Sequence, residues 1–220
     1  GFGARYAAAQ ARWPSGRGIR VGRLMLKGTN AQIDAAIDDA LTRAGFQVVR
    51  LPDSFRDAWD EAKRDGNTIA AVGTWLSYDK LGGMTGITTR TKNAILFGQA
   101  LYGKGYWEAL ARLRVWTHTL QDTLKGVDFI ALPTLQSTPP LMTIDLRIGV
   151  MDARVLNLQN TVPVNVAGNP AVAVPVPLKH ADFPVTSLQL IGRLKSEAEL
   201  LNAARLVEVA LGTTGVAPTR

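Results

Sequence analysis

The chain has 220 residues, a formal net charge of +7, 46% hydrophobic and 20% charged residues, and no cysteine. These values are typical of one large or two small folded domains, and they exclude disordered, collagen-like and disulfide-framework proteins. Without cysteine the chain has no disulfide, thiolate metal ligand or cysteine nucleophile. No apolar run reaches the roughly 18 residues of a membrane span, so we predict no span. The expected location is the cytoplasm, with a secreted or periplasmic one left open.

Residues 1–18 form a poorly defined N-terminal segment ahead of one domain over residues 19–220. The chain begins with Gly and lacks the basic, apolar and small-residue order of a signal peptide, so we expect a cut or processed end. The basic excess is concentrated near this end, but no helix-turn-helix, RNA-recognition or zinc-finger motif accompanies it. This pattern favours a solvated basic surface and argues against nucleic-acid binding.

Residues 19–51 predict a β-α-β unit. Residues 19–26 read as a strand, and the apolar residues that follow recur at helical spacing between Asn30, a candidate N-cap, and Gly45, a candidate stop. A second strand covers residues 46–51, and a right-handed crossover makes the two strands parallel. The predicted fold class is therefore α/β, with a mixed β-sheet flanked by helices.

Residues 53–125 predict a helical block. Its helices cover residues 53–81, residues 88–101 with Thr88 as cap, and residues 106–124 with Gly126 as stop. The chain has five tryptophans, most of them in this block, and their helical spacing favours core positions over a ligand wall. The apolar stretch DFIALP then predicts a buried strand.

The remaining part of the chain predicts one long loop and a β-rich end. Residues 133–160 are irregular and rich in proline, which is typical of a functional loop. Residues 161–168 predict a short helix, and residues 170–177 a strand buried on both faces. A strand over 185–192 and a closing helix follow, with Ser196 as candidate cap.

The sequence contains no catalytic constellation that can be assigned from residue types alone. His118 and His180 are far apart, with no HExxH motif or acidic cluster nearby, so surface positions are expected. No GxSxG elbow and no phosphate-binding glycine loop occurs in the required context. We therefore predict no metal and no cofactor.

Four segments follow one another along the chain: GQALYGKGYWEALARLR, DFIALPTLQSTPP, TVPVNVAGNPAVAVP and SLQLIGRLKSEAELLNAARLVE. In this order they resemble the C-terminal half of amidase-signature enzymes. The matching positions are Gly98, Tyr106, Arg112, Pro133-Thr134, Asn165, Gly168, Pro170-Ala171, Gln189-Leu190, Glu197, Leu200-Leu201 and Glu208.

The resemblance implies an amide hydrolase whose serine nucleophile, second serine and lysine base lie in the N-terminal half of such enzymes. No matching Gly-Ser-rich segment occurs in these 220 residues, so no catalytic residue is assigned to this chain. The resemblance also implies a substrate-facing wall at Thr161, Val164 and Asn165, with Thr134 and Asn157 as further candidates. A structural role is an equal alternative for each, such as a core position for Val164.

Three hypotheses remain. The favoured one is a C-terminal chain or segment of an amidase, completed by an N-terminal half on a separate chain or missing segment and acting on a small-molecule amide. The second is a non-catalytic binding or assembly subunit built on the same half-fold. The third, a nucleic-acid-associated amide-transfer module, rests only on the net charge and the resemblance. The oligomeric state stays open, a homo-oligomer included.

Overall fold

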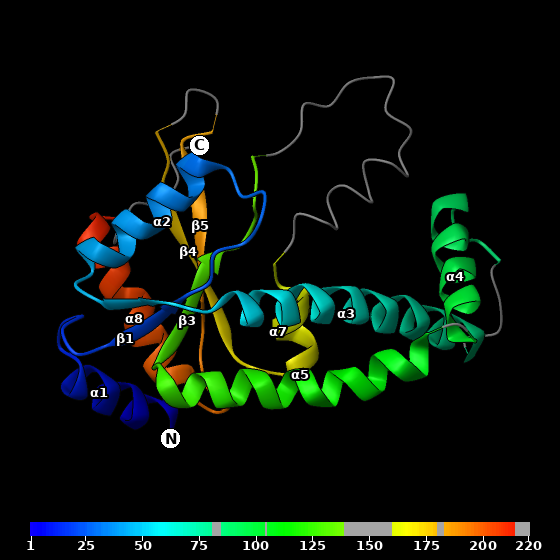
Figure 1. Cartoon of the computed structure of the whole chain (residues 1–220), viewed down its shortest axis with the longest axis horizontal. Helices are drawn as coiled ribbons and strands as arrows, with labels where there is room; N and C mark the ends of the chain where they lie inside the picture. Colours follow the sequence, from blue (N-terminus) through cyan, green and yellow to red (C-terminus); the bar gives the residue numbers. More distant parts are fainter. Residues whose placement is uncertain (81–84, 104, 139–159, 180–182, 214–220) are drawn as a thin grey trace.

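A computed structural model describes residues 1–80, 85–103, 105–138, 160–179 and 183–213 (Figure 1). In chain order the elements are α1 (Phe2–Arg12), β1 (Arg20–Arg23), α2 (Ala31–Arg43), β2 (Gln47–Arg50), α3 (Asp53–Lys80), α4 (Thr89–Tyr102), α5 (Tyr106–Gly126), β3 (Phe129–Pro133), α7 (Val162–Ala167), β4 (Ala171–Pro177), β5 (Val185–Ile191) and α8 (Glu197–Leu211). Most of the loop predicted over residues 133–160, Asn157 included, lies outside the described residues. No helix among the described residues is both long and apolar enough to cross a membrane.

The five strands form one mixed sheet in the order β2-β1-β3-β5-β4. Strand β1 runs parallel to β2 and β3, whereas β5 runs antiparallel to β3 and β4. Val21 of β1 lies between Val48 of β2 and Phe129 of β3. The predicted fold class and the parallel β-α-β unit are confirmed.

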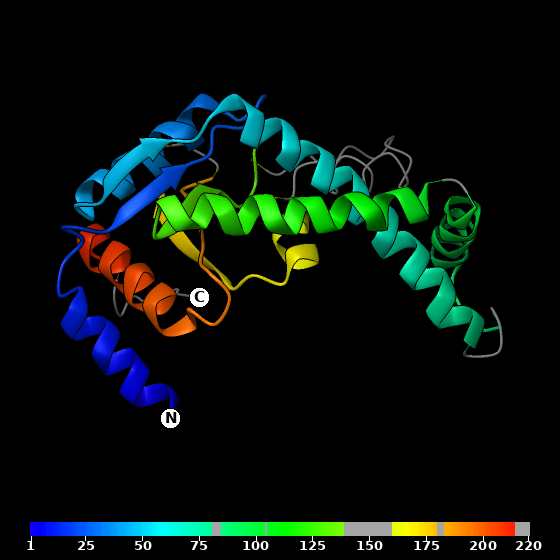
Figure 2. The same cartoon turned by 60° about the horizontal axis from the view of Figure 1, so that its bottom comes forward.

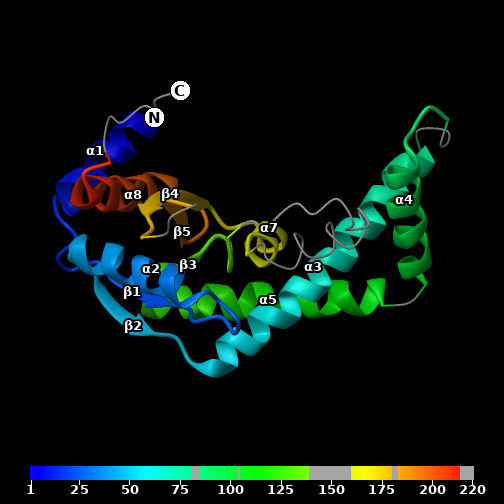
Figure 3. The ribbon, with the colours of Figure 1, turned by 90° about the horizontal axis from the view of Figure 1, so that it is seen from above.

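Helices cover the sheet on two faces. On one face, α2 and α8 bury Ile37, Leu41 and Val207 against Val21 and Leu190 of the sheet. On the other face, helices α3, α5 and α7 form the second core with apolar residues from the strands and their ends. Figure 3 shows α1, α2 and α8 gathered along one side of the sheet and α5 along the other.

Helix α3 has 28 residues and, with α4 and the start of α5, extends well beyond the sheet (Figure 2). Helix α4 packs closely on α3, since a Cβ at Gly98 would overlap the carbonyl oxygen of Ala71. The rings of Trp75 and Tyr102 lie 5.1 Å apart in this part of the structure. Trp107 is 60% exposed, so it is not a core residue of the described chain.

Residues 1–18, for which the sequence predicted no element, contain helix α1. Its C-terminal end is held by Asn202 of α8, whose Nδ2 donates to the carbonyl oxygens of Ala9 at 3.2 Å and Trp13 at 2.9 Å. The helix is therefore fixed by a residue from the far end of the chain.

All three predicted cap residues occupy the N-cap position of their helix, and two of them make the capping hydrogen bond. Asn30 Oδ1 and Thr88 Oγ1 accept hydrogen bonds from backbone N–H groups two and three residues further on. Ser196 is the N-cap residue of α8, as predicted, but it makes no capping hydrogen bond, because its Oγ donates to the carbonyl oxygen of Arg193 at 2.7 Å. Helix α8 thus begins without a side-chain cap.

The prediction that residues 170–177 form a strand buried on both faces is also wrong. Within the described residues, strand β4 lies at the edge of the sheet and pairs with β5 alone. Val174 and Val176 are buried under α2 and α8, whereas Ala173, Pro175 and Pro177 are exposed. The continuous apolar sequence therefore reflects an alternating strand whose second face is exposed in the described part of the chain.

Candidate functional site

The order in which the chain adds strands to the sheet changes direction between the neighbouring strands β1 and β3. From β1 it passes through α2 on one face to β2, and it then returns through α3, α4 and α5 on the other face to β3. The parallel strands β1 and β3 therefore sit at a topological switch point, and ligands of open α/β sheets bind beyond the carboxyl ends of such strands. A ligand site is therefore expected at this edge of the sheet.

The segments that follow β1 and β3 are tied together at this edge. The backbone N–H of Asn30 donates to the carbonyl oxygen of Gln136 at 2.8 Å, and Gln136 Nε2 donates to that of Lys27 at 2.8 Å. These reciprocal bonds hold the start of α2 against the chain that leaves β3.

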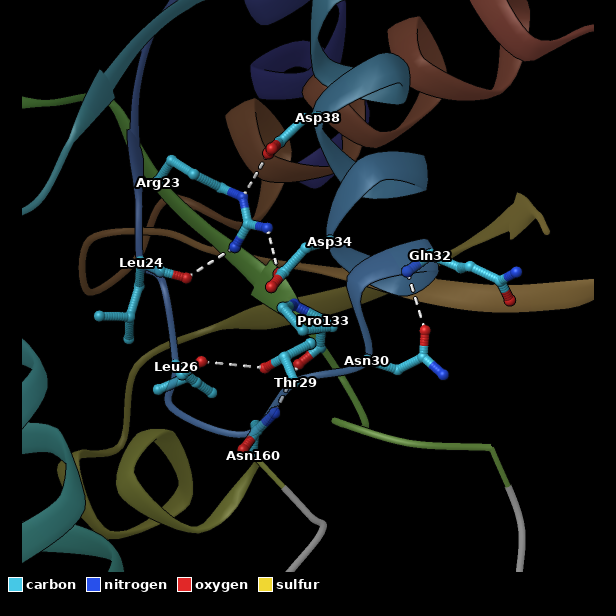
Figure 4. Close-up of polar contacts among 10 residues, drawn as sticks. All are labelled: Arg23, Leu24, Leu26, Thr29, Asn30, Gln32, Asp34, Asp38, Pro133 and Asn160. Carbon is cyan, nitrogen blue, oxygen red and sulfur yellow. Dashed lines mark hydrogen bonds and ion pairs between the residues drawn. The ribbon is translucent and has the colours of Figure 1, made fainter. Parts of the chain in front are cut away.

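A buried ion cluster fixes the end of β1. Arg23 is 3% exposed and donates from Nη2 to Asp34 at 2.6 Å, from Nε to Asp38 at 2.7 Å and from Nη1 to the carbonyl oxygen of Leu24 at 2.6 Å (Figure 4). Both carboxylates come from α2. A buried charge needs such partners because leaving water is costly, and the cluster thereby locks α2 onto the end of β1.

Asn160 connects the end of β3 to the chain that enters α7. Its Nδ2 donates to the carbonyl oxygen of Pro133 at 2.8 Å (Figure 4). Its backbone N–H donates to the carbonyl oxygen of Thr134 at 3.1 Å. Its own carbonyl oxygen accepts from Gln189 Nε2 at 3.1 Å. Asn160 is fully buried, and within the described part of the chain its Oδ1 has no hydrogen-bond partner. This residue positions Thr161 next to the end of β3.

Thr134 and Ser187 place two hydroxyl groups at the same edge. The backbone N–H of Thr134 donates to the carbonyl oxygen of Ser187 at 2.8 Å, and the two Oγ atoms lie 3.0 Å apart. Ser187 lines a cavity of about 310 Å³ whose other walls include Leu135, Phe183 and Val185. An apolar cavity with a few placed polar groups has the character of a small-molecule site.

Helix α7 carries the predicted site residues Val164 and Asn165, and Thr161 is its N-cap; the helix is held by α3 and α5. Trp116 Nε1 of α5 donates to the carbonyl oxygen of Pro163 at 2.8 Å. A Cβ at Gly66 of α3 would lie 2.5 Å from Val162 Cγ1 and 3.0 Å from Val166 Cγ1, so only glycine allows this close approach. The position of α7 is therefore set by backbone contact and one buried hydrogen bond.

Next to this contact, an ion pair joins α3 and α5. Asp65 is 6% exposed and accepts from Arg112 Nε at 2.9 Å and Nη2 at 2.8 Å. These hydrogen bonds raise the pKa of the Arg112 guanidinium above its usual range, with the charge of the same carboxylate acting in the same direction. The pair is a fork-to-fork bond that fixes the two helices relative to each other.

The structure brings some of the predicted site residues together. Thr134 and Thr161 are both half-buried and flank Asn160 at the edge of the sheet. Val164 is 1% exposed and packs in the core beneath α3 and α5, while Asn165 is exposed on α7. Asn157 is not among the described residues.

Sequence reasoning missed Arg23, Asn160 and Ser187. Arg23 and Asn160 carried no motif, and their role depends on partners that only the fold brings close. Ser187 lies two residues before Gln189, a position of the family pattern, and this neighbourhood was the only signal that could have found it.

The described residues contain no group of three or more His, Cys, Asp or Glu side chains that could hold a metal ion. His118 lies on the outer side of α5, with its Nε2 3.2 Å from Asp122 Oδ2. A hydrogen bond from Lys125 lowers the pKa of Asp122, and His118 adds to this effect. This exposed charge group is remote from the sheet edge and is typical of a solvated helix face.

Comparison with known proteins assigns the chain to one family. The family model described as Amidase matches residues 65–201, which is more than half of the chain. The chain is 31% identical over 147 residues to a glutamyl-tRNA(Gln) amidotransferase subunit of Ehrlichia canis, covering 62% of this chain and 29% of that protein. With the protein of the same name from Geotalea daltonii the identity is 26% over 222 aligned residues, covering 87% and 45%.

The fold is also found in solved structures. A 6-aminohexanoate cyclic dimer hydrolase superposes with a TM-score of 0.75 at 20% identity, covering 97% of this chain and 49% of that one. The present chain thus spans less than half the length of each of these three proteins. The match over residues 65–201 and the shared fold lead to one conclusion: the chain belongs to the amidase-signature family.

Proposed function

We propose that this chain is the C-terminal portion of an amide hydrolase and forms a wall of its substrate pocket. The reaction is the hydrolysis of an amide, in which water adds across the C–N bond of R–CO–NH–R′ and releases a carboxylic acid and an amine. The serine nucleophile, second serine and lysine base come from an N-terminal portion, on the same polypeptide or on another. The substrate is a small-molecule amide.

The observation that carries this proposal is the cavity at the carboxyl edge of the sheet in a chain of this family. The cavity is apolar with Ser187 in its wall, and the hydroxyl of Thr134 lies 3.0 Å from that of Ser187. Hydroxyl groups can donate to an amide carbonyl and accept from an amide N–H, so one pair can orient both ends of the bond. An apolar wall excludes water around them and strengthens these interactions.

The predicted residues take separate parts in this proposal. Thr134 and Thr161 contact the substrate from the two sides of Asn160, and Asn165 contacts the portion of the substrate that reaches along α7. Val164 shapes the wall from beneath, because it lies in the core. Asn157, which lies outside the described residues, stays a predicted contact.

The test compares the isolated chain with the chain joined to its N-terminal portion, made as one polypeptide or as two. The substrates are an acetylated aniline, a linear aliphatic amide and a cyclic amide, with amine release as the readout. We expect no turnover by the isolated chain and turnover by the assembly. Turnover by the pure 220-residue chain, or none by any assembly, contradicts the proposal.

A pair of variants tests the cavity within an active assembly. Thr134→Val and Ser187→Ala remove the hydroxyls, and each should lower kcat/KM about tenfold, the loss expected for one hydrogen bond to the substrate. Thr119→Val, on α5, removes a hydroxyl whose one hydrogen bond within the described residues goes to the backbone of its own helix, and it serves as control. An equal kcat/KM for all three variants would show that the cavity takes no part in substrate binding.

A second candidate is a non-catalytic binding or assembly subunit. The projecting helices favour it, because Phe97 is 61% and Trp107 is 60% exposed there, and exposed apolar groups mark contact surfaces. The two amidotransferase relatives are also named as subunits. Native mass measurement distinguishes the two: a stable monomer without a catalytic partner supports the non-catalytic role, and co-purification with a Gly-Ser-rich polypeptide supports the hydrolase.

A further inference from the structure

A second cleft lies between α2 and the end of β4. Its volume is about 490 Å³, and its walls are formed by Gln32, Ala35, Ala36 and Asp39 of α2 and, from the β4 side, by Pro177 and Lys179. This volume is within the range of small-molecule sites, which is about 300–1,000 Å³. None of these residues lines the cavity at Ser187, so the proposed hydrolase function leaves the cleft unused.

The wall from α2 is a single stripe of the helix. Residues three and four positions apart lie on the same side of a helix, and the lining residues of α2 have this spacing. Gln32 and Asp39 stand at the two ends of the stripe, about 10 Å apart along the helix axis. Figure 4 shows the side chain of Gln32 on the side of α2 away from Arg23. Ala35 and Ala36 lie between the two polar residues and form a shallow apolar floor.

The facing wall carries a positive charge. Lys179 is exposed, and the ion pairs within the described part of the chain do not include it. The backbone N–H of Leu178 donates to the carbonyl oxygen of Pro184 at 2.8 Å, which holds this wall in place. The Lys179 ammonium is therefore open to an anionic group of a ligand.

Asp39 is available for the cationic group of a ligand. Its Oδ2 lies 3.8 Å from Arg43 Nη1, and the two side chains are 64% and 48% exposed. An exposed pair of this kind contributes little, and Arg43 also donates from Nη2 to the carbonyl oxygen of Ala210 at 2.7 Å. The cleft thus presents one carboxylate and one ammonium on facing walls.

This arrangement selects the chemistry of the ligand. A matching molecule carries an ammonium group for Asp39 and a carboxylate for Lys179, and the two groups must be separated because they meet facing walls. A free α-amino acid carries both charges on one carbon atom, whereas a dipeptide places a peptide group between them. The side-chain amide of Gln32 has both a donor and an acceptor, as a peptide group requires. Small apolar side chains match the floor at Ala35 and Ala36.

We propose that this cleft is a binding site for a dipeptide with free termini and small side chains. The ammonium group of the dipeptide donates to Asp39, its carboxylate accepts from Lys179, and its peptide group bonds Gln32. The site is separate from the cavity at Ser187 and does not depend on amide hydrolysis by this family member. It adjoins that cavity, because Ile33 and Leu178 of the cavity wall are the sequence neighbours of cleft residues.

Calorimetric titration of the 220-residue chain with alanyl-alanine tests the ligand class. We expect saturable binding with a Kd of roughly 1 mM or below. N-acetyl-alanyl-alanine lacks the ammonium group and alanyl-alaninamide lacks the carboxylate, so each should bind about fivefold more weakly, the effect of one partly exposed ion pair. Free alanine should also bind at least about fivefold more weakly than the dipeptide.

Charge variants assign each end of the dipeptide to one wall. Lys179→Met should weaken the binding of alanyl-alanine about fivefold and leave that of alanyl-alaninamide unchanged, because the amide has no carboxylate to lose. Asp39→Asn should show the same pattern with the acetylated dipeptide. Asp79→Asn and Lys80→Met, at the exposed far end of α3, make the same changes of charge and should alter the affinity less than about twofold.

A steric variant tests the cleft without changing any charge. Ala35→Leu puts a larger side chain on the floor, and leucine is a strong helix former that α2 accommodates. The binding of alanyl-alanine should fall at least roughly tenfold. Circular dichroism and the urea midpoint check that each variant is folded.

NMR shift mapping with alanyl-alanine locates the site. Amide shifts that saturate in residues 32–39 and 177–179 support the proposal. The proposal is overturned if the dipeptide does not bind below about 10 mM, if the blocked derivatives bind as tightly as the dipeptide, or if Ala35→Leu binds as the wild type does. Equal losses in the cleft variants and in the α3 controls overturn it as well.

Discussion

The buried ion cluster at the end of β1 gives the sharpest stability prediction. Arg23→Met keeps most of the side-chain volume and removes the guanidinium that bonds Asp34, Asp38 and the carbonyl oxygen of Leu24. Two carboxylates of α2 then lie near each other without a cation, and one buried carbonyl oxygen loses its partner. The variant should unfold more readily than the wild type.

The size of the stability loss in Arg23→Met follows from how exposed its two carboxylate partners are. Breaking a buried ion pair costs about 3–5 kcal/mol, but Asp38 is 52% exposed and its charge is largely screened by water. Asp34 is 17% exposed and accounts for most of the cost. We therefore expect the free energy of unfolding to fall by about 3 kcal/mol, near the lower end of the range for a buried pair.

Urea unfolding of the 220-residue chain measures this loss as a shift of the midpoint at constant slope. Arg20→Met is the matched control, since Arg20 is the exposed residue of the same strand, and it should change stability by less than about 0.5 kcal/mol. Adding Asp34→Asn to Arg23→Met should restore about 1–2 kcal/mol, because the uncompensated charge is removed. A loss below about 1 kcal/mol for Arg23→Met, or no rescue, would refute the reasoning.

Two further predictions concern helix packing and a titration. Gly66→Ala places a Cβ 2.5 Å from Val162 and should lower the stability of the chain, because about 2 kcal/mol of overpacking outweighs about 1 kcal/mol gained in helix propensity. Gly73→Ala has no atom within 4 Å of the new Cβ and should instead stabilise the chain in the same urea measurement. Loss of stability in both variants would contradict this account. The carboxyl pKa of Asp122 should lie below 3.8 by NMR titration. The ionised carboxylate therefore stabilises the fold above that pH, and this contribution is lost as the pH falls through the lowered pKa. Lys125→Met should raise the pKa of Asp122, and an unchanged pKa would exclude the hydrogen bond from Lys125 as the cause of the shift.

Local sequence signals predicted much of the scaffold but less of the site. The spacing of apolar residues and the caps at Asn30 and Thr88 indicated helices that the structure contains. Thr134 and Thr161 were named from the family pattern, and both lie at the carboxyl edge of the sheet. Their connection through Asn160 was not predictable, because a single asparagine in a loop has no periodic signal.

The sequence by itself determined the α/β class, the parallel unit at residues 19–51 and the short helix α7, since each depends on contacts between neighbours in the chain. The tertiary structure alone decided which face of β4 is covered, because an apolar run reads the same at the centre and at the edge of a sheet. It also decided that Thr134 meets Ser187, a residue 53 positions away. Such pairs arise when strands align in register, and strand order is a property of the whole fold.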